Sequence, residues 1–466
     1  MKLTSRIPVR EQDPEIRKNN FDEVSFGYNE DEAAAEASRC LNCKKPMCVT
    51  NCPVGINIPG FIMHVKEKNF REAASVIFKS SVLPAVCGRV CPQEIQCEGK
   101  CILGVKGEAV SVGKLERFVG DWSRENNVSV PVSAQPNGYK VAVIGSGPAG
   151  LTCAGELASM GYSVTIFEAL HKAGGVLEYG IPEFRLPKEK VVTYEVENVR
   201  RMGVKIITNA VIGKAGNIDD LFDNEGFDAV FVGTGAGLPV FMNIPGENLN
   251  GVLSANEFLT RINLMKAYDD DFDTPVRTGQ RVSVVGGGNV AMDAARAAVR
   301  LGAEVTVIYR RSAEELPARK EEVHHAHQEG IIFRFLTNPV EVIGNNTGWV
   351  TGLKCVKMEL GEPDESGRRR PTVIEGSEFI VDTDTVIMSL GTSPNPLIAG
   401  TTPKLETDRR GCVKALDENG TTTREGVFAA GDVVTGSATV ILAMGAARKT
   451  ARAIDNYIKS KHTGKQ

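Results

Sequence analysis

The sequence predicts an α/β protein in which two Rossmann-like nucleotide-binding domains follow a smaller helical domain. Two observations lead to this prediction. After residue 138, short apolar segments alternate with helical segments, which is typical of helices packed around parallel sheets. A glycine-rich unit occurs twice in this part of the chain, whereas eight of the 11 cysteines lie before it, between Cys40 and Cys101.

Composition excludes several classes of function. The 466 residues are 42% hydrophobic and carry 54 Lys and Arg against 58 Asp and Glu, a net charge of −4. Such a balance argues against a nucleic-acid-binding protein. No apolar run approaches the roughly 20 residues of a membrane helix, and residues 1–18 are too charged for a signal peptide. We therefore expect a cytoplasmic protein that binds neither nucleic acid nor membrane.

The segment before residue 130 is predicted to be mainly helical. Asn29 can cap a helix, because the three acidic residues that follow it are favourable in a first helical turn. A second helical stretch is expected over residues 69–80. Residues 125–138 contain two prolines and several Ser and Asn residues, which indicates a linker.

The glycine-rich unit is an internal repeat. Residues 140–168 and 281–309 superimpose without a gap at an offset of 141. Each copy has the pattern of a strand, a glycine turn, a helix, a glycine and a second strand, which is that of a dinucleotide-binding unit. Two copies in one chain predict two nucleotide sites.

The first copy carries G-x-G-x-x-G directly after an apolar strand. The first glycine makes the tight turn, the second lets the backbone approach a pyrophosphate, and the third allows close packing of helix on strand. The helix N-terminus attracts the phosphates, and an acidic residue ending the second strand can accept hydrogen bonds from ribose hydroxyls. The residues expected to bind here are Gly145, Gly147, Pro148, Ala149, Gly150 and Glu168.

In the second copy, Tyr309 replaces the acidic residue at the strand end, and Arg310 and Arg311 follow. A carboxylate at this point would repel a 2′-phosphate, whereas arginines pair with it. The second site is therefore predicted to prefer NADP(H) to NAD(H). The residues expected to bind NADP(H) are Gly287, Gly288, Asn289, Val290, Arg310, Arg311 and Arg319.

Together, the two copies resemble the paired nucleotide domains of disulfide-reductase-type flavoproteins, in which the NADPH domain interrupts the FAD domain. Residues 174–187 resemble a segment that lines the flavin, residues 384–395 the return crossing, and residues 426–436 the second FAD fingerprint. The resemblance implies further FAD contacts from Gly175, Gly180, Arg185, Thr234, Gly431, Asp432 and Thr439. The implied domains are a cysteine domain at 1–130, FAD segments at 138–250 and 391–466, and an NADP(H)-binding domain at 251–390.

A dithiol reductase is not expected. Such chemistry needs a pair of cysteines beside the flavin, and Cys153, Cys355 and Cys412 are single cysteines without a resolving partner. We expect these three residues to be buried as small hydrophobic side chains. Electrons must then leave the flavin by another route.

The cysteine-rich segment is the candidate for that route. Its eight cysteines form two groups, and each group contains a C-x3-C spacing and a Cys-Pro pair, as bacterial ferredoxin segments do. Structural zinc favours two C-x2-C knuckles, and only one occurs here. With a flavin downstream, two [4Fe–4S] clusters are expected rather than zinc. The groups are Cys40, Cys43, Cys48 and Cys52, followed by Cys87, Cys91, Cys97 and Cys101.

Three segments carry a more specific resemblance: CLNCKKPMCVTNCPVGINIPGFI, LPAVCGRVCPQEIQCEGKC and SVGKLERF. They resemble the N-terminal domain shared by the small subunit of NADPH-dependent glutamate synthase, dihydropyrimidine dehydrogenase and the large subunit of NADH-dependent reduced ferredoxin:NADP+ oxidoreductase. The residues alone nominate Cys87 as the eighth ligand, whereas the resemblance implies Glu116. The implied ligand sets are Cys40, Cys43, Cys48 and Cys101 for one cluster, and Cys52, Cys91, Cys97 and Glu116 for the other.

This resemblance implies a relay in which hydride passes between NADP(H) and FAD and the clusters carry single electrons. The cysteine segments look closer to those of the ferredoxin:NADP+ enzyme, which implies electron bifurcation to ferredoxin and, through a small ferredoxin-reductase-like flavoprotein subunit, to NAD+. The small subunit of glutamate synthase is the alternative, and a nucleotide-binding scaffold without turnover is the non-enzymatic one. No catalytic side chain is expected, because hydride transfer requires no acid, base or nucleophile.

Overall fold

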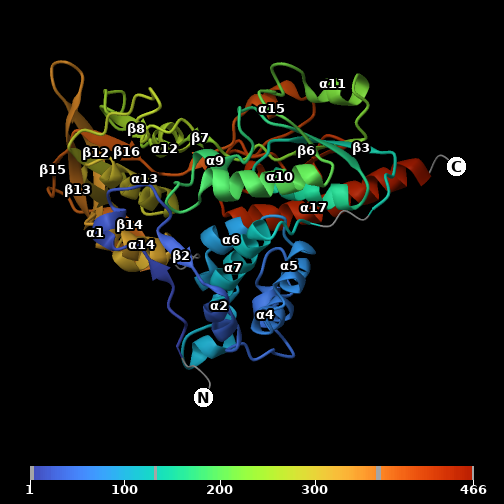
Figure 1. Ribbon diagram of the computed structural model, residues 1–466. Helices are drawn as coiled ribbons and strands as arrows, with labels where there is room; N and C mark the ends of the chain where they lie inside the picture. The colour runs from blue at the N-terminus through green and yellow to red at the C-terminus, as the bar shows by residue number, and fades with distance from the viewer. Residues whose placement is uncertain (1–4, 131–133, 364–368, 464–466) are drawn as a thin grey trace.

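The computed structural model describes residues 5–130, 134–363 and 369–463. Figure 1 shows three lobes, with a helical N-terminal lobe at the bottom and two sheet-containing lobes side by side above it. The long helix α17, Val440–Thr463, runs between one of the upper lobes and the helical lobe. Among the residues described, no helix is both long enough and apolar enough to cross a membrane.

The helical lobe contains both helices expected from the sequence. Asn29 caps α2 in a capping box with Glu32, in which each side chain accepts a hydrogen bond from the backbone N–H of the other residue. Asn69 directly precedes α5, inside the predicted stretch. The elements of this lobe are α2 Glu30–Ala37, α3 Met47–Thr50, α4 Ile58–Lys66, α5 Phe70–Phe78, α6 Pro84–Val90, η1 Gln93–Ile95, η2 Glu98–Lys100, η3 Ile102–Val105 and α7 Val112–Glu125.

An N-terminal arm connects the helical lobe to one of the upper lobes. Arg17 in the arm is 1% exposed, and its Nε lies 3.0 Å from Glu329 Oε1 in that upper lobe. Glu329 also pairs with Arg296 and Arg300, so a buried charge network anchors the arm. The elements of the arm are β1 Arg10–Glu11, α1 Pro14–Arg17 and β2 Ser25–Gly27.

The internal repeat is present in the backbone as it is in the sequence. Each bound of the second unit is 141 higher than the matching bound of the first, so the two units have the same strand and helix lengths. The first unit is β3 Lys140–Ile144, α8 Pro148–Ser159 and β4 Ser163–Phe167. The second unit is β9 Arg281–Val285, α13 Asn289–Arg300 and β10 Glu304–Ile308.

Each repeat forms the centre of a five-stranded parallel sheet. The strand orders are β18-β6-β3-β4-β5 and β11-β10-β9-β16-β8. Strand β18 follows the whole second sheet in the chain but completes the first sheet, which confirms the predicted fold with an interrupted first domain. The other strands of the two sheets are β5 Lys205–Ile207, β6 Ala229–Val232, β8 Val252–Ser254, β11 Ile332–Arg334, β16 Thr385–Met388 and β18 Val427–Ala429.

An antiparallel sheet, which was not predicted from the sequence, extends the second nucleotide lobe. Its strands are β12 Thr337–Gly344, β13 Val350–Pro363, β14 Arg369–Val373 and β15 Phe379–Asp382. A short pair, β7 Leu238–Pro239 and β17 Thr392–Ser393, joins the two chain crossings between the upper lobes. The remaining helices are α9 Val176–Tyr179, η4 Lys188–Thr193, α10 Tyr194–Arg201, α11 Ile218–Asp223, α12 Ala255–Asn263, η5 Ala313–Glu315, α14 Lys320–Gln328, α15 Leu397–Thr401 and α16 Asp432–Thr435.

Candidate cofactor sites

The first glycine turn has the geometry that a pyrophosphate requires. Gly145 has a φ of +97°, and a Cβ added there would lie 2.7 Å from the carbonyl oxygen of Gly233. A Cβ at Gly150 would clash with the carbonyl oxygen of Gly145, so the helix can pack on the strand only with glycine at that position. At Gly147 a Cβ would meet nothing within 4 Å, so the backbone is open on the side where phosphates would approach.

Acidic side chains from both FAD segments converge beside this turn. Glu168 accepts hydrogen bonds from the backbone N–H of Ser146 at 2.9 Å and from its hydroxyl at 2.5 Å. A Cβ on Gly431 would lie 3.1 Å from the Cβ of Ala149, which places the turn that begins α16 against the first turn of α8. Asp432 follows Gly431, and burial raises the pKa of its carboxyl to about 6.

Tyr179 belongs to the same space, although the sequence analysis did not single it out. Burial raises the pKa of its hydroxyl to about 12, and the nearby carboxylates of Asp432 and Glu168 add to the shift. Tyr179 lies inside 174–187, the segment whose resemblance to flavin-lining segments was the available clue. The Tyr179 hydroxyl therefore lies near both carboxylates, those of Asp432 and Glu168.

The other predicted FAD residues lie at turns around this space. A Cβ on Gly175 would lie 2.7 Å from Cα of Gly147, so the 174–187 segment covers the glycine turn. Gly180 ends α9, and Thr234 is exposed directly after β6. Thr439 accepts a hydrogen bond from the Leu442 N–H at 3.4 Å, at the start of α17.

Arg185, whose place in the FAD set stays a prediction, is paired with acids of the other nucleotide lobe. Its Nη1 donates to both carboxylate oxygens of Asp293, at 2.7 and 2.6 Å, and its Nε lies 3.0 Å from Glu322. Both acids belong to the second nucleotide lobe. The guanidinium is therefore used to join the two lobes, because a buried charge must be paired.

The second glycine turn repeats the features of the first. A Cβ at Gly288 would meet nothing within 4 Å, as at the matching position of the first turn. A Cβ at Gly287 would lie 2.7 Å from the ring of Tyr309, whose hydroxyl donates to the Glu315 carbonyl at 2.8 Å. Asn289 begins α13, and the next residue, Val290, is 47% exposed.

The three predicted arginines divide into two groups. Arg310 is exposed after β10, and Nε of Arg311 donates to the carbonyl of Arg369 at 3.0 Å. Arg319 differs, because its Nη1 donates to the Arg89 carbonyl at 2.8 Å and its Nη2 to Gln93 Oε1 at 3.1 Å, both in the cysteine domain. Arg310 and Arg311 are therefore the first candidates for the 2′-phosphate, and the placement of Arg319 there stays a prediction.

The first set of implied cluster ligands lies together near the surface. Burial raises the pKa of the Cys40 thiol, and the neighbouring thiols of Cys43 and Cys101 raise it further. Burial also raises the pKa of Cys48 to about 11, with Cys40 and Cys101 contributing. All four cysteines are partly exposed. The four cysteines, from two distant segments, therefore lie near one another.

The second implied set is deeper and includes a carboxylate. Burial raises the pKa of Cys97, and Glu98, followed by Glu116, Cys91 and Cys52, adds to the shift. Glu116 is 7% exposed, its Oε1 has no hydrogen-bond partner, and burial raises its pKa to about 8. An orphaned buried carboxylate oxygen is costly unless it binds a ligand. The buried Glu116 carboxylate, beside three cysteines of the described residues, therefore fits the role of an iron ligand.

Cys87 lies beside the second set, next to α17. Its Sγ is 3.5 Å from Sδ of Met444 in α17, and the pKa of its thiol is raised by a hydrogen bond with Cys91 and by burial. Across the described residues, no three His, Cys, Asp or Glu side chains are placed to hold a single metal ion. A [4Fe–4S] cluster makes a different demand, because each of its four ligands binds a different iron.

Helix α17 brings the second set against the FAD domain. A Cβ on Gly445 would lie 2.6 Å from the carbonyl oxygen of Pro53, the residue after Cys52. Arg448 of the same helix donates to the carbonyls of Val54 and Lys79. The cysteine domain is thus held directly on the helix that follows the Asp432 motif.

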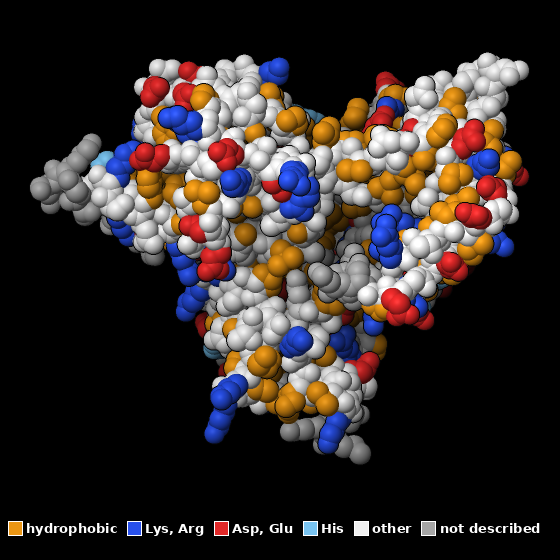
Figure 2. Space-filling model, turned by 180° about the vertical axis from the view of Figure 1, so that it is seen from behind, with side chains coloured by type: hydrophobic (Ala, Val, Ile, Leu, Met, Phe, Trp, Pro, Cys, Tyr) orange, Lys and Arg blue, Asp and Glu red, His pale blue; other side chains and the backbone are white. Residues whose placement is uncertain are grey.

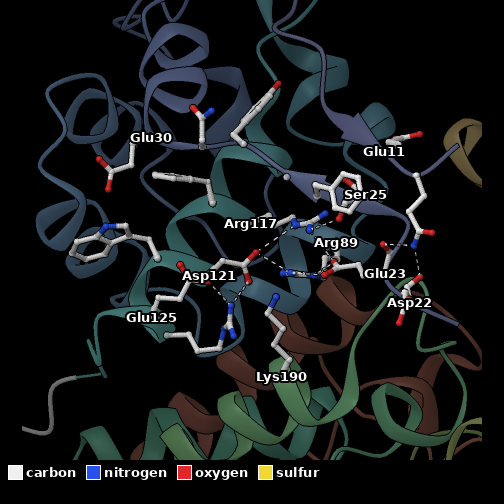
Figure 3. Close-up of a pocket in the computed structure, with 18 of the residues that line it drawn as sticks. Glu11, Asp22, Glu23, Ser25, Glu30, Arg89, Arg117, Asp121, Glu125 and Lys190 are labelled. Carbon is white, nitrogen blue, oxygen red and sulfur yellow. Dashed lines mark hydrogen bonds and ion pairs between the residues drawn. The ribbon is translucent and has the colours of Figure 1, made fainter. Parts of the chain in front are cut away.

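A cavity of about 940 Å³ opens between the arm, α6 and α7. Figure 3 shows Arg89 and Arg117 between Glu23 and Asp121, and Arg89 lies 2.7 Å from Glu23 and 2.8 Å from Asp121. These charges neutralise one another, and none of the predicted cofactor residues lines the cavity. We therefore assign no cofactor to this cavity.

Known proteins match both parts of the chain. Residues 17–128 match the family described as dihydropyrimidine dehydrogenase domain II, 4Fe-4S cluster, and residues 139–451 match the pyridine nucleotide-disulphide oxidoreductase family. The chain is 38% identical over 462 residues to the glutamate synthase [NADPH] small chain of Escherichia coli and 40% identical over 465 residues to that of Halomonas elongata, with 97% of each chain covered in both pairs. The chain belongs to the glutamate synthase small-chain family. It is accordingly an NADPH-dependent flavin and iron–sulfur oxidoreductase whose cofactors are FAD, NADP(H) and [4Fe–4S] clusters.

Relatives of this small-chain family also occur within longer chains. The protein is 37% identical to the NADP(+)-dependent formate dehydrogenase subunit beta of Moorella thermoacetica, of which it covers 64%. Among solved structures, Mycobacterium tuberculosis FprA in complex with NADPH has a TM-score of 0.59 at 21% identity, covering 71% of this chain and 86% of FprA. The T. acidophilum thioredoxin reductase has a TM-score of 0.50 at 21% identity, covering 69% and 98%. The likeness between this chain and each of these two structures is one of fold.

Proposed function

We propose that this chain is the NADPH-oxidising relay subunit of a larger complex, in which electrons from NADPH reach a partner protein through FAD and two [4Fe–4S] clusters. When bound, FAD supplies an acceptor for hydride that can release electrons one at a time. The observation that carries the proposal is the contact of Pro53, the residue after Cys52, and of Cys87 with α17, the helix that follows the Asp432 motif.

The residues of the chain suggest an order for this relay. Cys91 and Cys97 are buried, and Cys87 and Pro53 of the same part of the domain contact α17, whereas Cys40 and Cys43 are partly exposed. We assign Cys52, Cys91, Cys97 and Glu116 to the cluster next to the flavin. Cys40, Cys43, Cys48 and Cys101 then hold the cluster from which electrons leave.

For the acceptor, we propose ferredoxin together with a small ferredoxin-reductase-like flavoprotein subunit that passes electrons on to NAD+. The support is the similarity of the two cysteine segments to those of the ferredoxin:NADP+ enzyme. In this function the chain is the bifurcating subunit, oxidising NADPH or forming it in the reverse direction. Bifurcation requires a flavin whose two one-electron potentials differ widely, so these two potentials must be measured directly.

A second acceptor is favoured by a separate observation. Two glutamate synthase small chains match this chain end to end, with 97% coverage on both sides. The same relay would then deliver electrons to a large glutamate-forming subunit. Both functions use the same FAD, NADP(H) and cluster residues, so only the partner distinguishes them.

The decisive experiment is anaerobic purification of this chain from its native cell under mild conditions, with mass spectrometry of what accompanies it. A small ferredoxin-reductase-like flavoprotein supports the bifurcating complex. A large amidotransferase-type subunit supports glutamate synthesis and contradicts the ferredoxin proposal. A chain that fails to bleach its flavin when NADPH is added anaerobically contradicts both.

A further inference from the structure

The segment just before α14 is bonded to the second glycine turn. The backbone N–H of Arg319 donates to Oδ1 of Asn289 at 2.9 Å, and the backbone N–H of Ala318 donates to the carbonyl of Gly287 at 3.2 Å. Asn289 begins α13, and a helix N-terminus is where phosphates accept hydrogen bonds. A nucleotide bound at this turn would therefore act on the backbone that carries Arg319.

The side chain of Arg319 leaves its own lobe and enters the cysteine domain. Figure 2 shows this domain as the lower lobe, in contact with the lobes above it. Arg319 is 6% exposed, its Nη1 donates to the carbonyl of Arg89, and its Nη2 donates to Oε1 of Gln93. A planar guanidinium held at two points has little freedom to move. The two domains are therefore joined here by a fixed bridge.

Gln93 uses the other atom of its amide to hold the chain beside a proposed cluster ligand. Its Nε2 donates to the carbonyls of Cys87 and Gly88, at 3.3 Å in each case. Cys91 lies between Gly88 and Gln93 in the sequence, and Gln93 is 5% exposed. A change in the position of the Gln93 side chain would therefore change the backbone around Cys91.

Helix α7, which carries Glu116, is shaped around the same side chain. A Cβ on Gly113 would lie 2.2 Å from Nε2 of Gln93, so the helix can come this close only with glycine there. On the same helix, Nζ of Lys114 lies 2.5 Å from Oε1 of Glu321 in the NADP(H) lobe. This lobe thus contacts α7 as well as the loop that contains Gln93.

These contacts belong to one of the two sets of proposed cluster ligands. The reduction potential of an iron–sulfur cluster depends on hydrogen bonding and solvent exposure around its ligands. We call the set next to α17 the inner group, its cluster the inner cluster, and the other set the outer group. The inner group is Cys52, Cys91, Cys97 and Glu116, and the outer group is Cys40, Cys43, Cys48 and Cys101.

We propose that Gln93 is a positioning residue for the inner cluster, and that Arg319 makes the reduction potential of this cluster depend on nucleotide binding at the second glycine turn. The proposal rests on the proposed function, because it requires the inner group to hold a cluster. Nucleotide binding itself transfers no electron and breaks no bond. A nucleotide that shifts the potential must bind the oxidised and the reduced protein with different affinities, because coupling between two sites is reciprocal.

The test uses the intact holoprotein under anaerobic conditions and 2′-phospho-ADP-ribose as the probe. This probe is NADP+ without its nicotinamide, so it can occupy the site but accepts no electrons. Redox titration followed by electron paramagnetic resonance gives the potential of each cluster with and without the probe. Calorimetry gives the affinity of the probe for the oxidised and for the dithionite-reduced protein.

Two variants break the bridge and one serves as the matched control. Gln93→Met keeps the length of the side chain but removes its hydrogen bonds. Arg319→Lys keeps the charge but loses the planar fork. The control is Gln96→Met in the same loop, because Gln96 is half-buried and its side chain makes no hydrogen bond within the described part of the chain. Iron content is checked for each variant.

In the wild type and in Gln96→Met, we expect the affinity of the probe to differ about fivefold or more between the two redox states. Fivefold equals a shift of about 40 mV in the inner cluster, at about 59 mV per tenfold for one electron. Gln93→Met should change the potential of the inner cluster even without the probe. Both bridge variants should lose the shift that the probe causes, while the potential of the outer cluster stays the same in all proteins.

Equal shifts in the wild type and in the two bridge variants would overturn the proposal, and so would a wild type without any shift. If Gln93→Met loses iron, Arg319→Lys decides, because it leaves Gln93 in place. Failure of NADPH to bleach the flavin of the wild-type holoprotein would instead contradict the proposed function. The two failures are therefore distinguishable.

Discussion

The inner and outer ends of the cysteine domain differ in every property that matters for electron transfer. At the inner end, Cys91 and Cys97 are buried, and Glu116 contributes a carboxylate oxygen without a partner. At the outer end all four candidate ligands are cysteines, and all are partly exposed. The inner end contacts α17 of the FAD domain through Cys87 and Pro53, whereas the cysteines of the outer end are partly exposed.

This difference assigns positions in a relay to two groups with similar sequence spacing. Burial against α17 places one group where only the flavin domain can reach it. The cysteines of the outer group are partly exposed, so a second protein can reach that group. Neither group could do the work of the other, so each should respond differently when it is altered.

The largest effect is expected from Glu116, the one non-cysteine among the eight proposed cluster ligands. Glu116→Ala should lose about half of the iron, because one of two four-iron clusters loses a ligand. Cys87→Ala should keep its iron, because that thiol is already engaged with Cys91 and Met444. Iron and sulfide analysis with electron paramagnetic resonance checks both. The reverse outcome would make Cys87 the ligand and remove the carboxylate from the comparison.

The point at which electrons enter can be tested at the second glycine turn. Arg310→Ser/Arg311→Ser should weaken NADPH binding by about 10- to 100-fold, because charge-assisted hydrogen bonds to the 2′-phosphate are lost. NADH binding should change little. Arg319→Ser should spare NADPH, since its guanidinium bonds the cysteine domain. Titration of each nucleotide measures this, and equal losses for NADPH and NADH would contradict the assignment.

The close contact at α17 sharpens the contrast between the two ends. Gly445→Ala should destabilise the protein by about 1–3 kcal/mol, because an added methyl group overpacks the contact with Pro53. Electron transfer between flavin and inner cluster should slow, while ferredoxin docking at the outer end is retained. Gly400→Ala is the matched control, since a Cβ there meets nothing within 4 Å. Denaturant unfolding and stopped-flow kinetics give both values, and identical behaviour of the two variants would refute the contact.

The smallest effect is expected at Glu195, whose carboxyl group reaches from α10 of the FAD domain to the start of α6. It accepts hydrogen bonds from the N–H groups of Ala85 and Val86, at 2.7 and 3.1 Å, and so caps α6. Glu195→Ala should cost about 1 kcal/mol, as loss of a helix cap does, and should speed loss of the inner cluster alone. Glu197→Ala, on the exposed side of α10, is the control. Loss of both clusters at equal rates would contradict the link.

Sequence patterns were sufficient where function requires a specific backbone. Gly145, Gly147 and Gly150 are needed by sterics alone, and the gapless offset between the repeats reappears in every strand and helix bound. The fold class and the interrupted first domain followed from this regularity. Cys153, Cys355 and Cys412 are buried, as expected for small hydrophobic residues.

Side-chain direction could not be obtained in this way. Arg185 and Arg319 stand in segments that match cofactor motifs, but their guanidinium groups join one lobe to another. The partners that decide this, Asp293 and Gln93, are distant in sequence. The segment that contains Tyr179 was identified from its resemblance to flavin-lining segments, but the direction of the Tyr179 side chain was not. The antiparallel sheet after β11 was also missed.

The most direct test of the account removes one end at a time. Cys48→Ser disables the outer group, and Cys91→Ser disables the inner one. Each variant is reduced with dithionite, freed of excess reductant and mixed with NADP+, while rapid-freeze electron paramagnetic resonance follows reoxidation of the remaining cluster. We predict rapid reoxidation in Cys48→Ser, because the inner cluster still adjoins the flavin, and very slow reoxidation in Cys91→Ser. Rapid reoxidation in Cys91→Ser with slow reoxidation in Cys48→Ser would contradict the order of the relay.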